Sequence, residues 1–364
     1  FILAGSIMNS AGISRRLIAF ASALVGFIKG GLSMINIATS MFFAEISGSA
    51  VADVAALGSI LIPAMKKKGY PGAFAAAVTS SSASLAIIIP PSIPMIVYAV
   101  MSQSSVVQLF VAGIIPGVIG GFFLMLAAYV TARKKNFPVE ETFNIPNVKK
   151  TAKDAALAFL LPVIILGGIF GGVVTATEGA GLAVVASLVI GFIYKEIDFK
   201  RLYESACEGA IQTASVMLLV AASVLLGEFL TIEQIPQKVA ESIIEFTNNK
   251  YAVLGILNIF LLIIGFFLHS VAAIILTVPI VMPLVNAVGI DPVHFGIIVT
   301  LNLAIGQQTP PVASVLVTAC SVAKQISGMY RSNISFICVL LVLLLLVTYV
   351  PAIPMTLVEY FYRS

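Results

Sequence analysis

The sequence is poor in charged residues, and this shortage excludes a water-soluble protein. Of its 364 residues, 10% are charged and 60% are hydrophobic, and the mean hydropathy is +1.09. A soluble globular chain carries roughly 25% charged residues, so this chain has too little polar surface to cover a body in water. Apolar stretches of about 20 residues, the length that crosses a bilayer, recur along it. The class that remains is an all-α polytopic membrane protein.

Several functional motifs are also missing. The three cysteines lie in apolar segments without paired or metal-ligand spacing, which argues against a disulfide scaffold and against a transition-metal site. No lysine-rich tract with interleaved aromatics is present, so nucleic acid is not an expected partner. The sequence has no Walker-type Gly-Lys-Ser/Thr loop and neither the Gly-x-Ser-x-Gly nor the His-Glu-x-x-His signature. We therefore expect no cofactor and no ATP hydrolysis.

Polar residues interrupt two apolar segments in the first half of the chain. The segment 32–65 contains a polar stretch from Glu45 to Asp53, and the apolar pieces on either side are each too short to span about 30 Å. This predicts a re-entrant helical hairpin over 32–65 whose Ser-Gly-Ser tip lies at mid-depth. The segment 72–100 is long enough to span, but hydroxyl residues at 79–84 and the sequence Pro90-Pro91-Ser92 interrupt it. Such interruptions predict a broken transmembrane helix.

The second half repeats these landmarks about 220 positions later. Pro63 corresponds to Pro283, and Pro90-Pro91 corresponds to Pro310-Pro311. An amphipathic segment precedes each hairpin, and we interpret both segments as interfacial arms that brace a moving unit. The predicted organisation is a first repeat over 1–153 (arm 13–28, hairpin 32–65, broken helix 72–100, helix 107–131), connecting transmembrane helices over 154–206, and a second repeat over 207–364 (arm 233–250, hairpin 251–288, broken helix 293–323, last helix 333–356).

The basic residues predict the topology. If the triple lysine at 66–68 is cytoplasmic, alternation of the spans puts 133–153, 195–201, Lys324 and Arg331 on the same side. These segments hold 14 of the 20 Lys and Arg residues, as the positive-inside rule expects. The two hairpins then enter from opposite faces, so the halves are predicted to be inverted repeats, an architecture of many secondary transporters.

The polar residues at the breaks predict a binding site, because a central Asp costs about 2.5–3.5 kcal/mol on insertion scales. Hydroxyls and freed carbonyls are hard oxygen ligands, and paired broken helices of this kind bind sodium and anionic substrates at mid-membrane. The first predicted region comprises Ser47, Gly48, Ser49, Asp53, Thr79, Ser81, Ser82, Ser84 and Ser92. The second comprises His269, Ser270, Asn302, Gly306 and Thr309.

Alternatives stay open at this point. Asp53 could instead cap the second hairpin helix, where a carboxylate is favoured, and His269 could be a hydrogen-bonded interior group. For the whole chain the alternatives are an intramembrane enzyme that uses Ser49, Asp53 and His269, and an ion channel with re-entrant loops. The enzyme would leave the duplicated broken helices unexplained, and the long hairpins and arms favour moving gates over a channel.

Specific motifs resemble a known family. These are Phe1-Ile2-Leu3-Ala4-Gly5, the tip from Ser47 to Asp53, Ile88-Ile89-Pro90-Pro91-Ser92-Ile93, the run from Gly289 to Gly296, and Thr309-Pro310-Pro311-Val312. In this order, over essentially the whole chain, they resemble the large membrane subunit of TRAP (tripartite ATP-independent periplasmic) transporters. That subunit usually begins about 60 residues earlier, and Phe1 reads as a helix interior, so we expect further residues upstream.

The resemblance implies an elevator-type, sodium-coupled importer of an organic acid, such as a C4-dicarboxylate or sialic acid. It implies a multi-pass protein of the bacterial inner membrane. The implied partners are a small membrane subunit of about four helices and a periplasmic substrate-binding protein. Ser47, Gly48, Ser49 and Asp53 would belong to the first ion and substrate region, together with the break at 79–84. Gly306 and Thr309 would belong to the second ion region.

Overall fold

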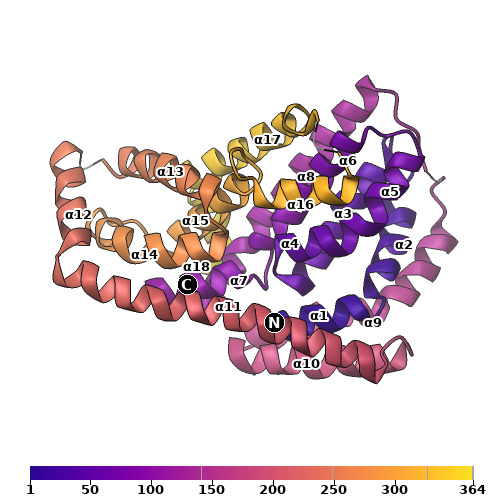
Figure 1. Cartoon of the computed structure of the whole chain (residues 1–364), viewed down its shortest axis with the longest axis horizontal. Helices are drawn as coiled ribbons and strands as arrows, with labels where there is room; N and C mark the ends of the chain where they lie inside the picture. Colours follow the sequence, from indigo (N-terminus) through magenta and orange to yellow (C-terminus); the bar gives the residue numbers. More distant parts are fainter. Residues whose placement is uncertain (141, 248, 326, 363–364) are drawn as a thin grey trace.

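The chain folds into helices throughout its described part. The structure, a computed structural model, describes residues 1–140, 142–247, 249–325 and 327–362, without the side chains of residues 45–47, 224, 226, 227 and 231. Every regular element that these residues form is a helix (Figure 1). Seven helices in the described part are long and apolar enough to cross a membrane. They agree with the predicted all-α polytopic membrane protein.

The first hairpin follows two N-terminal helices. Helices α1 (Ile2–Ser10) and α2 (Ile13–Val25) precede α3 (Gly31–Ser47), and α2 packs against α3 through a buried stripe of Ile13, Leu17 and Ala21. The return leg runs through α4 (Ala50–Asp53), the π-helical turn η1 (Val54–Gly58) and α5 (Ser59–Lys67). A Pro inside α5 and the wider turn of η1 keep this leg from being one regular α-helix.

The first break separates α6 (Gly72–Ala83) from α7 (Ile93–Ser102). Helix α6 tightens into the 3₁₀ turn η2 (Ser84–Ile87) and then stops, because neither Pro90 nor Pro91 has an N–H to continue the ladder. Ser92 holds the ends together: its hydroxyl donates to the Ile87 carbonyl (2.7 Å) and accepts from the Met95 N–H (3.4 Å). The chain then spans the molecule as α8 (Val106–Lys134).

Three long helices connect the two halves. They are α9 (Ile145–Phe170), α10 (Ala176–Ile193) and α11 (Phe199–Ile232). Helix α10 starts at a capping box in which Thr175 and Glu178 satisfy each other's backbone N–H groups. Helix α11 runs along one edge of the molecule (Figure 1) and contacts α1, α12 and α14.

Helix α12 (Ile235–Phe246) lies within the predicted second arm, 233–250. A second hairpin follows, made of α13 (Lys250–Phe267) and α14 (Ser270–Ala287). Helices α15 (Pro292–Gly306) and α16 (Ser314–Ala323) are separated at Pro310-Pro311. The predicted last helix, 333–356, is divided into α17 (Met329–Tyr349) and α18 (Ala352–Tyr362), because Pro351 cannot donate a helical hydrogen bond.

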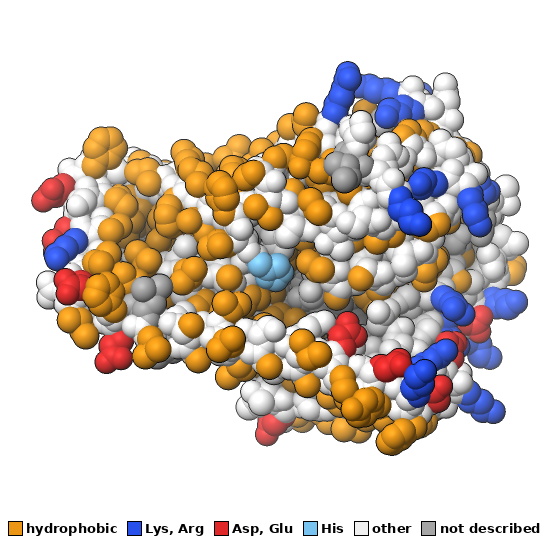
Figure 2. Space-filling model, in the orientation of Figure 1, with side chains coloured by type: hydrophobic (Ala, Val, Ile, Leu, Met, Phe, Trp, Pro, Cys, Tyr) orange, Lys and Arg blue, Asp and Glu red, His pale blue; other side chains and the backbone are white. Residues whose placement is uncertain are grey.

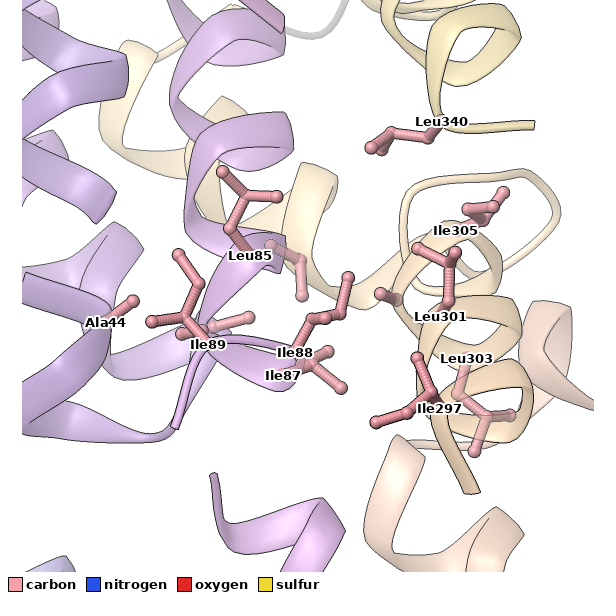
Figure 3. Close-up of a cluster of buried hydrophobic side chains, with 14 of the residues drawn as sticks. Ala44, Leu85, Ile87, Ile88, Ile89, Ile297, Leu301, Leu303, Ile305 and Leu340 are labelled. Carbon is pink, nitrogen blue, oxygen red and sulfur yellow. The ribbon is translucent and has the colours of Figure 1, made fainter. Parts of the chain in front are cut away.

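An apolar cluster joins the first break to the second half. Figure 3 shows Leu85, Ile87, Ile88 and Ile89 from the first break on one side and side chains of α15, including Ile297 and Leu301, on the other. All of these side chains are at most 6% exposed. Helices in a membrane associate mainly through van der Waals packing, so this cluster fixes where the first break lies against α15.

Basic residues gather at one end of the molecule. Lys68 pairs with Glu140 (3.0 Å), Arg16 pairs with Glu196 (3.1 Å), and Lys66 donates to the Ala323 carbonyl (2.9 Å). Figure 2 shows Lys and Arg concentrated at this end and mostly apolar side chains across the middle of the visible face. At this end, burial and the neighbouring Glu140 carboxylate raise the pKa of Tyr70 to about 12. The positive-inside rule places this end on the cytoplasmic side.

The turn after α14 lies at the end of the molecule where α12 lies (Figure 1), and Lys250 donates there to the Gly289 carbonyl (3.5 Å). We expect Lys67→Cys and Asn286→Cys, each introduced into a chain without its three native cysteines, to react with a membrane-impermeant maleimide from opposite sides of the membrane. Labelling of right-side-out and inside-out vesicles measures this. Labelling of both positions from the same side would contradict the arrangement.

Candidate functional site

A cavity of about 470 Å³ opens where the two hairpin tips meet. Its wall combines segments far apart in the sequence. The first tip contributes Gly48 to Ala52, the second contributes His269, Ser270 and Val271, and the two broken helices contribute Ile87, Ile93, Pro94 and Gln307. Residues of α1 and α11 complete the wall. Of the predicted residues, the structure brings Gly48, Ser49, His269 and Ser270 together around this space.

The first tip is a tight turn that rests on the first break. Gly48 ends α3 with a left-handed φ of 60°, and Ser49 is extended before α4 begins. The Gly48 carbonyl accepts a hydrogen bond from the Ile93 N–H (3.4 Å). A Cβ on Gly48 would lie 2.9 Å from the Pro91 carbonyl oxygen. Both the backbone conformation and this close approach therefore require glycine.

The second tip rests on the second break in a similar way. Helix α13 ends at Phe267, and Leu268 and His269 are extended before α14 begins. The Phe266 carbonyl accepts from the Val312 N–H (3.4 Å). His269 is exposed at the cavity, whereas Ser270 is 1% exposed. Each hairpin tip is thus hydrogen-bonded to a residue one or two positions after a proline pair.

Helix α14 presents its N-terminal end to the cavity, and its N-cap His269 makes no capping hydrogen bond through its side chain. Residues at the start of α7 also line the cavity, but the N–H groups of Ile93 and Met95 are already bonded to Gly48 and Ser92. The first N–H groups of a helix lack intrahelical partners and carry about half a unit of positive charge, so they favour an anion. No Lys or Arg lies among the cavity-lining residues that the structure describes. An anion in this cavity would be held chiefly by backbone N–H groups and hydroxyls.

Asp53 lies just behind the first tip. It occupies the first turn of the return leg, is 0% exposed and does not line the cavity. A carboxylate near this N-terminal end is stabilised by the helix dipole, and it adds negative charge to the region that a cation would enter. The side chain of Ser47 lies outside the described residues.

Hydroxyl residues of α6 form a buried network with the first hairpin. Asn36 donates to Thr79 (2.7 Å), Ser82 donates to the Asn36 side-chain oxygen (3.2 Å), and Ser40 donates to Ser82 (2.9 Å). All four side chains are 0% exposed. Thr79 and Ser82, which are predicted members of the first sodium and substrate region, lie away from the cavity and bond α6 to α3.

A second network ties the two breaks to each other. Ser81 donates to the Gln308 side-chain oxygen (2.7 Å), and the Gln308 amide donates to Ser84 (2.8 Å). Asn333 of α17 donates to the Gln308 carbonyl (3.1 Å). Ser81 and Ser84 therefore act between helices, and Ser92, described above, closes the first break. The prediction did not include Gln308, although it lies in the polar run before the second proline pair.

The remaining second-region residues also lie away from the cavity. Asn302 donates to Asn258 (2.6 Å), and Thr309 donates back to the Ile305 carbonyl (2.9 Å). Gly306 lies directly against Gly265, so that α13 and α15 cross at backbone contact. These residues shape the framework behind the second tip.

Several buried oxygens near the breaks accept no hydrogen bond from any residue that the structure describes. They are the side-chain oxygens of Thr39, Asn302, Gln307 and Ser314. A buried unsatisfied acceptor is costly, and such oxygens are suitable ligands for a hard cation. Gln307 and Ser314 flank the second break, and Gln307 also lines the cavity.

The prediction missed the polar face of α11. Glu208, Gln212 and Ser215 line the cavity. Their spacing of four and three residues places them on one face of a helix. A glutamate within an otherwise apolar span was the available signal.

Comparison with known proteins identifies similar chains. Residues 1–353 match the family described as "Tripartite ATP-independent periplasmic transporter, DctM component". The chain is 42% identical over 358 residues to the isethionate TRAP transporter permease DctMQ of Oleidesulfovibrio alaskensis, covering 98% of this chain and 56% of that protein. It is 40% identical to the C4-dicarboxylate large permease DctM of Pseudomonas aeruginosa (98% and 84%) and 36% identical to the sialic acid large permease SiaM of Vibrio cholerae (99% and 85%).

The backbone contact at Gly306 yields a stability prediction. A Cβ there would lie 2.5 Å from the carbonyl carbon of Gly265, so we expect Gly306→Ala to destabilise the protein by about 1–3 kcal/mol. Gly181→Ala in α10 is the matched control, because nothing lies within 4 Å of its added Cβ, and helix propensity favours Ala by about 1 kcal/mol. Melting temperatures in detergent compare the two variants. Equal stability would show that α13 and α15 do not cross as described.

Proposed function

The chain belongs to the DctM family of tripartite ATP-independent periplasmic transporters, and we propose that it imports an organic acid with sodium as the coupling ion. It is therefore a multi-pass protein of the bacterial inner membrane and a transporter, not an enzyme. Relatives are named for isethionate, C4-dicarboxylates and sialic acid, which are all organic acids. The observation that carries the proposal is the cavity lined by both hairpin tips.

The cavity suits an organic anion. The N-terminal end of α14 faces it, Ser49 and Ser270 supply hydroxyls, and apolar residues such as Ile87, Ile93 and Val271 cover the rest of the wall. A carboxylate or sulfonate group can accept hydrogen bonds from the N–H groups while its carbon skeleton contacts the apolar wall.

Sodium coupling is supported by oxygen groups at both breaks. Asp53 supplies negative charge behind the first tip, and the unsatisfied oxygens of Gln307 and Ser314 flank the second break. A negative charge near a site offsets part of the cost of desolvating a cation. We assign the first sodium region to the Ser47–Asp53 tip with the α6 break, and the second to His269, Ser270 and the Gly306–Thr309 segment.

We further propose that the halves are inverted repeats that work as an elevator. The predicted bounds, 1–153 and 207–364 around connecting helices at 154–206, remain the proposed division. One support is that arm, hairpin and broken helix follow one another in the same order in both halves. A second support is that each broken helix contacts the hairpin of the other half: α7 contacts α14, and α16 contacts α4, η1 and α5. The hairpins and broken helices would move as one unit relative to α1, α9, α10 and α11.

The driving force is adequate for two sodium ions. Each gains about 2.3 kcal/mol from a 100 mV potential and about 1.4 kcal/mol from a tenfold gradient, which gives roughly 7.4 kcal/mol for two ions. Importing a monoanion against the same potential costs about 2.3 kcal/mol. The remaining ~5 kcal/mol supports accumulation of roughly several thousandfold.

Asp53 provides the test of sodium coupling. Removing its charge should weaken cation binding, so we expect Asp53→Asn to raise the half-saturating sodium concentration for uptake by about tenfold or more. Uptake into proteoliposomes at varied sodium, with a melting temperature on the same preparation, measures this. Glu241→Gln on the exposed face of α12 is the control for loss of one carboxylate. A lower melting temperature with unchanged sodium dependence would leave Asp53 only its role as a helix cap. Separately, uptake by the native protein that does not saturate with substrate concentration would favour a channel.

The proposed partners are a small membrane subunit of about four helices and a periplasmic substrate-binding protein. In support, the family is tripartite by description, and the chain spans 56% of the DctMQ relative. We expect proteoliposomes that hold only the membrane subunits to take up little of the acid, and addition of the cognate binding protein to restore sodium-dependent uptake. Equal uptake rates with and without the binding protein would contradict this requirement.

A further inference from the structure

The wall of the cavity formed by α11 differs in charge from the hairpin tips. Glu208, Gln212 and Ser215 are its polar groups, and Glu208 is the only acidic residue among the described residues that line the cavity. The Glu208 carboxylate accepts a hydrogen bond from the Ser6 hydroxyl of α1 (2.8 Å). Its other oxygen lies 3.5 Å from the Gln212 side-chain nitrogen, which donates to it.

Glu208 retains hydrogen-bonding capacity for a ligand. A carboxylate has about four acceptor sites and no donor when ionised, and the two contacts above use about half of them. The Glu208 side chain is exposed. A ligand in the cavity can therefore reach the carboxylate without displacing Ser6.

The hairpin-tip and α11 parts of the cavity wall consequently prefer different groups. The N-terminal end of α14 at the second hairpin tip favours an anionic group. At the α11 wall, a second anionic group would meet Glu208 without any lysine or arginine from the described lining residues to compensate. Like charges in contact across a binding site oppose binding, whereas a hydroxyl or an ammonium group could donate to the carboxylate.

We propose that the cavity selects organic acids with a single anionic group and a hydrogen-bond donor at the far end of the molecule, and that Glu208 is the residue that rejects dianions. This inference rests on the proposed function, because it assumes that the cavity binds the transported acid. It narrows the substrate class from organic acids in general to acids that have one anionic group and a distal hydroxyl or ammonium group.

A series of four-carbon acids tests the proposal, because its members differ only at the distal group. The series is 4-hydroxybutyrate, 4-aminobutyrate, butyrate and succinate. Dissociation constants are measured by calorimetry on the permease purified with its small membrane subunit, at saturating sodium and without binding protein. We expect 4-hydroxybutyrate or 4-aminobutyrate to bind at least about tenfold more tightly than succinate, and also more tightly than butyrate. Whichever of 4-hydroxybutyrate and 4-aminobutyrate binds more tightly identifies the preferred donor.

Three variants of α11 assign the selectivity to Glu208. Glu208→Gln should bring succinate to within about threefold of 4-hydroxybutyrate, because the repulsion is lost while an acceptor oxygen remains. Glu208→Asp keeps the charge and should keep the order of the four acids. Glu204→Gln removes a carboxylate one turn away that is 62% exposed and does not line the cavity, so all four constants should stay unchanged.

Several results would overturn the inference. They are tighter binding of succinate than of both donor-bearing acids, an unchanged order in Glu208→Gln, and no binding of any acid in the series. The proposed function is tested separately, by sodium-dependent uptake of the native substrate in the complete tripartite system. If that uptake persists while the series fails, only the selectivity assigned to Glu208 is wrong. If that uptake is absent, the proposed function itself fails.

Discussion

Backbone hydrogen bonding within the membrane is the constraint on which the rest of this structure depends. Each proline pair ends a helix in the apolar interior, where an unpaired N–H or C=O costs several kcal/mol. The fold satisfies these groups from neighbouring elements. Ser92 closes the first break, and the Gly48 and Phe266 carbonyls accept from Ile93 and Val312. The hairpins are therefore needed to complete the broken helices, and the breaks in turn hold the hairpin tips.

The same constraint explains why so many polar side chains are buried away from the cavity. Thr79 and Ser82 bond to α3 through Asn36, while Ser81 and Ser84 reach Gln308 in the second half. These bonds join segments more than 40 and more than 220 residues apart. The two networks therefore join the first break to the first hairpin and to the second break.

The cavity itself is sparsely polar. Helix ends and a few hydroxyls face it from the hairpins, and one carboxylate faces it from α11. Under the proposed function, no lysine or arginine of the described lining would form a buried ion pair with the ligand, which favours its release. Transport requires release as well as binding, so weak, distributed contacts would suit it.

The sequence by itself determined the membrane class, both hairpins and both broken helices, because these follow from apolar length, doubled prolines and glycine turns, which are local signals. It also indicated the tip residues Gly48, Ser49, His269 and Ser270. It could not separate hydroxyls that line the cavity from hydroxyls that bond between helices, since Ser49 and Ser82 are chemically alike and only packing distinguishes them. The structure places Asn302, Gly306 and Thr309 away from the cavity, and their part in sodium binding stays a prediction. Tertiary structure alone decided that Glu208 and Gln307, 99 residues apart in the sequence, line one cavity, because that proximity arises from long-range packing of helices and not from any local pattern.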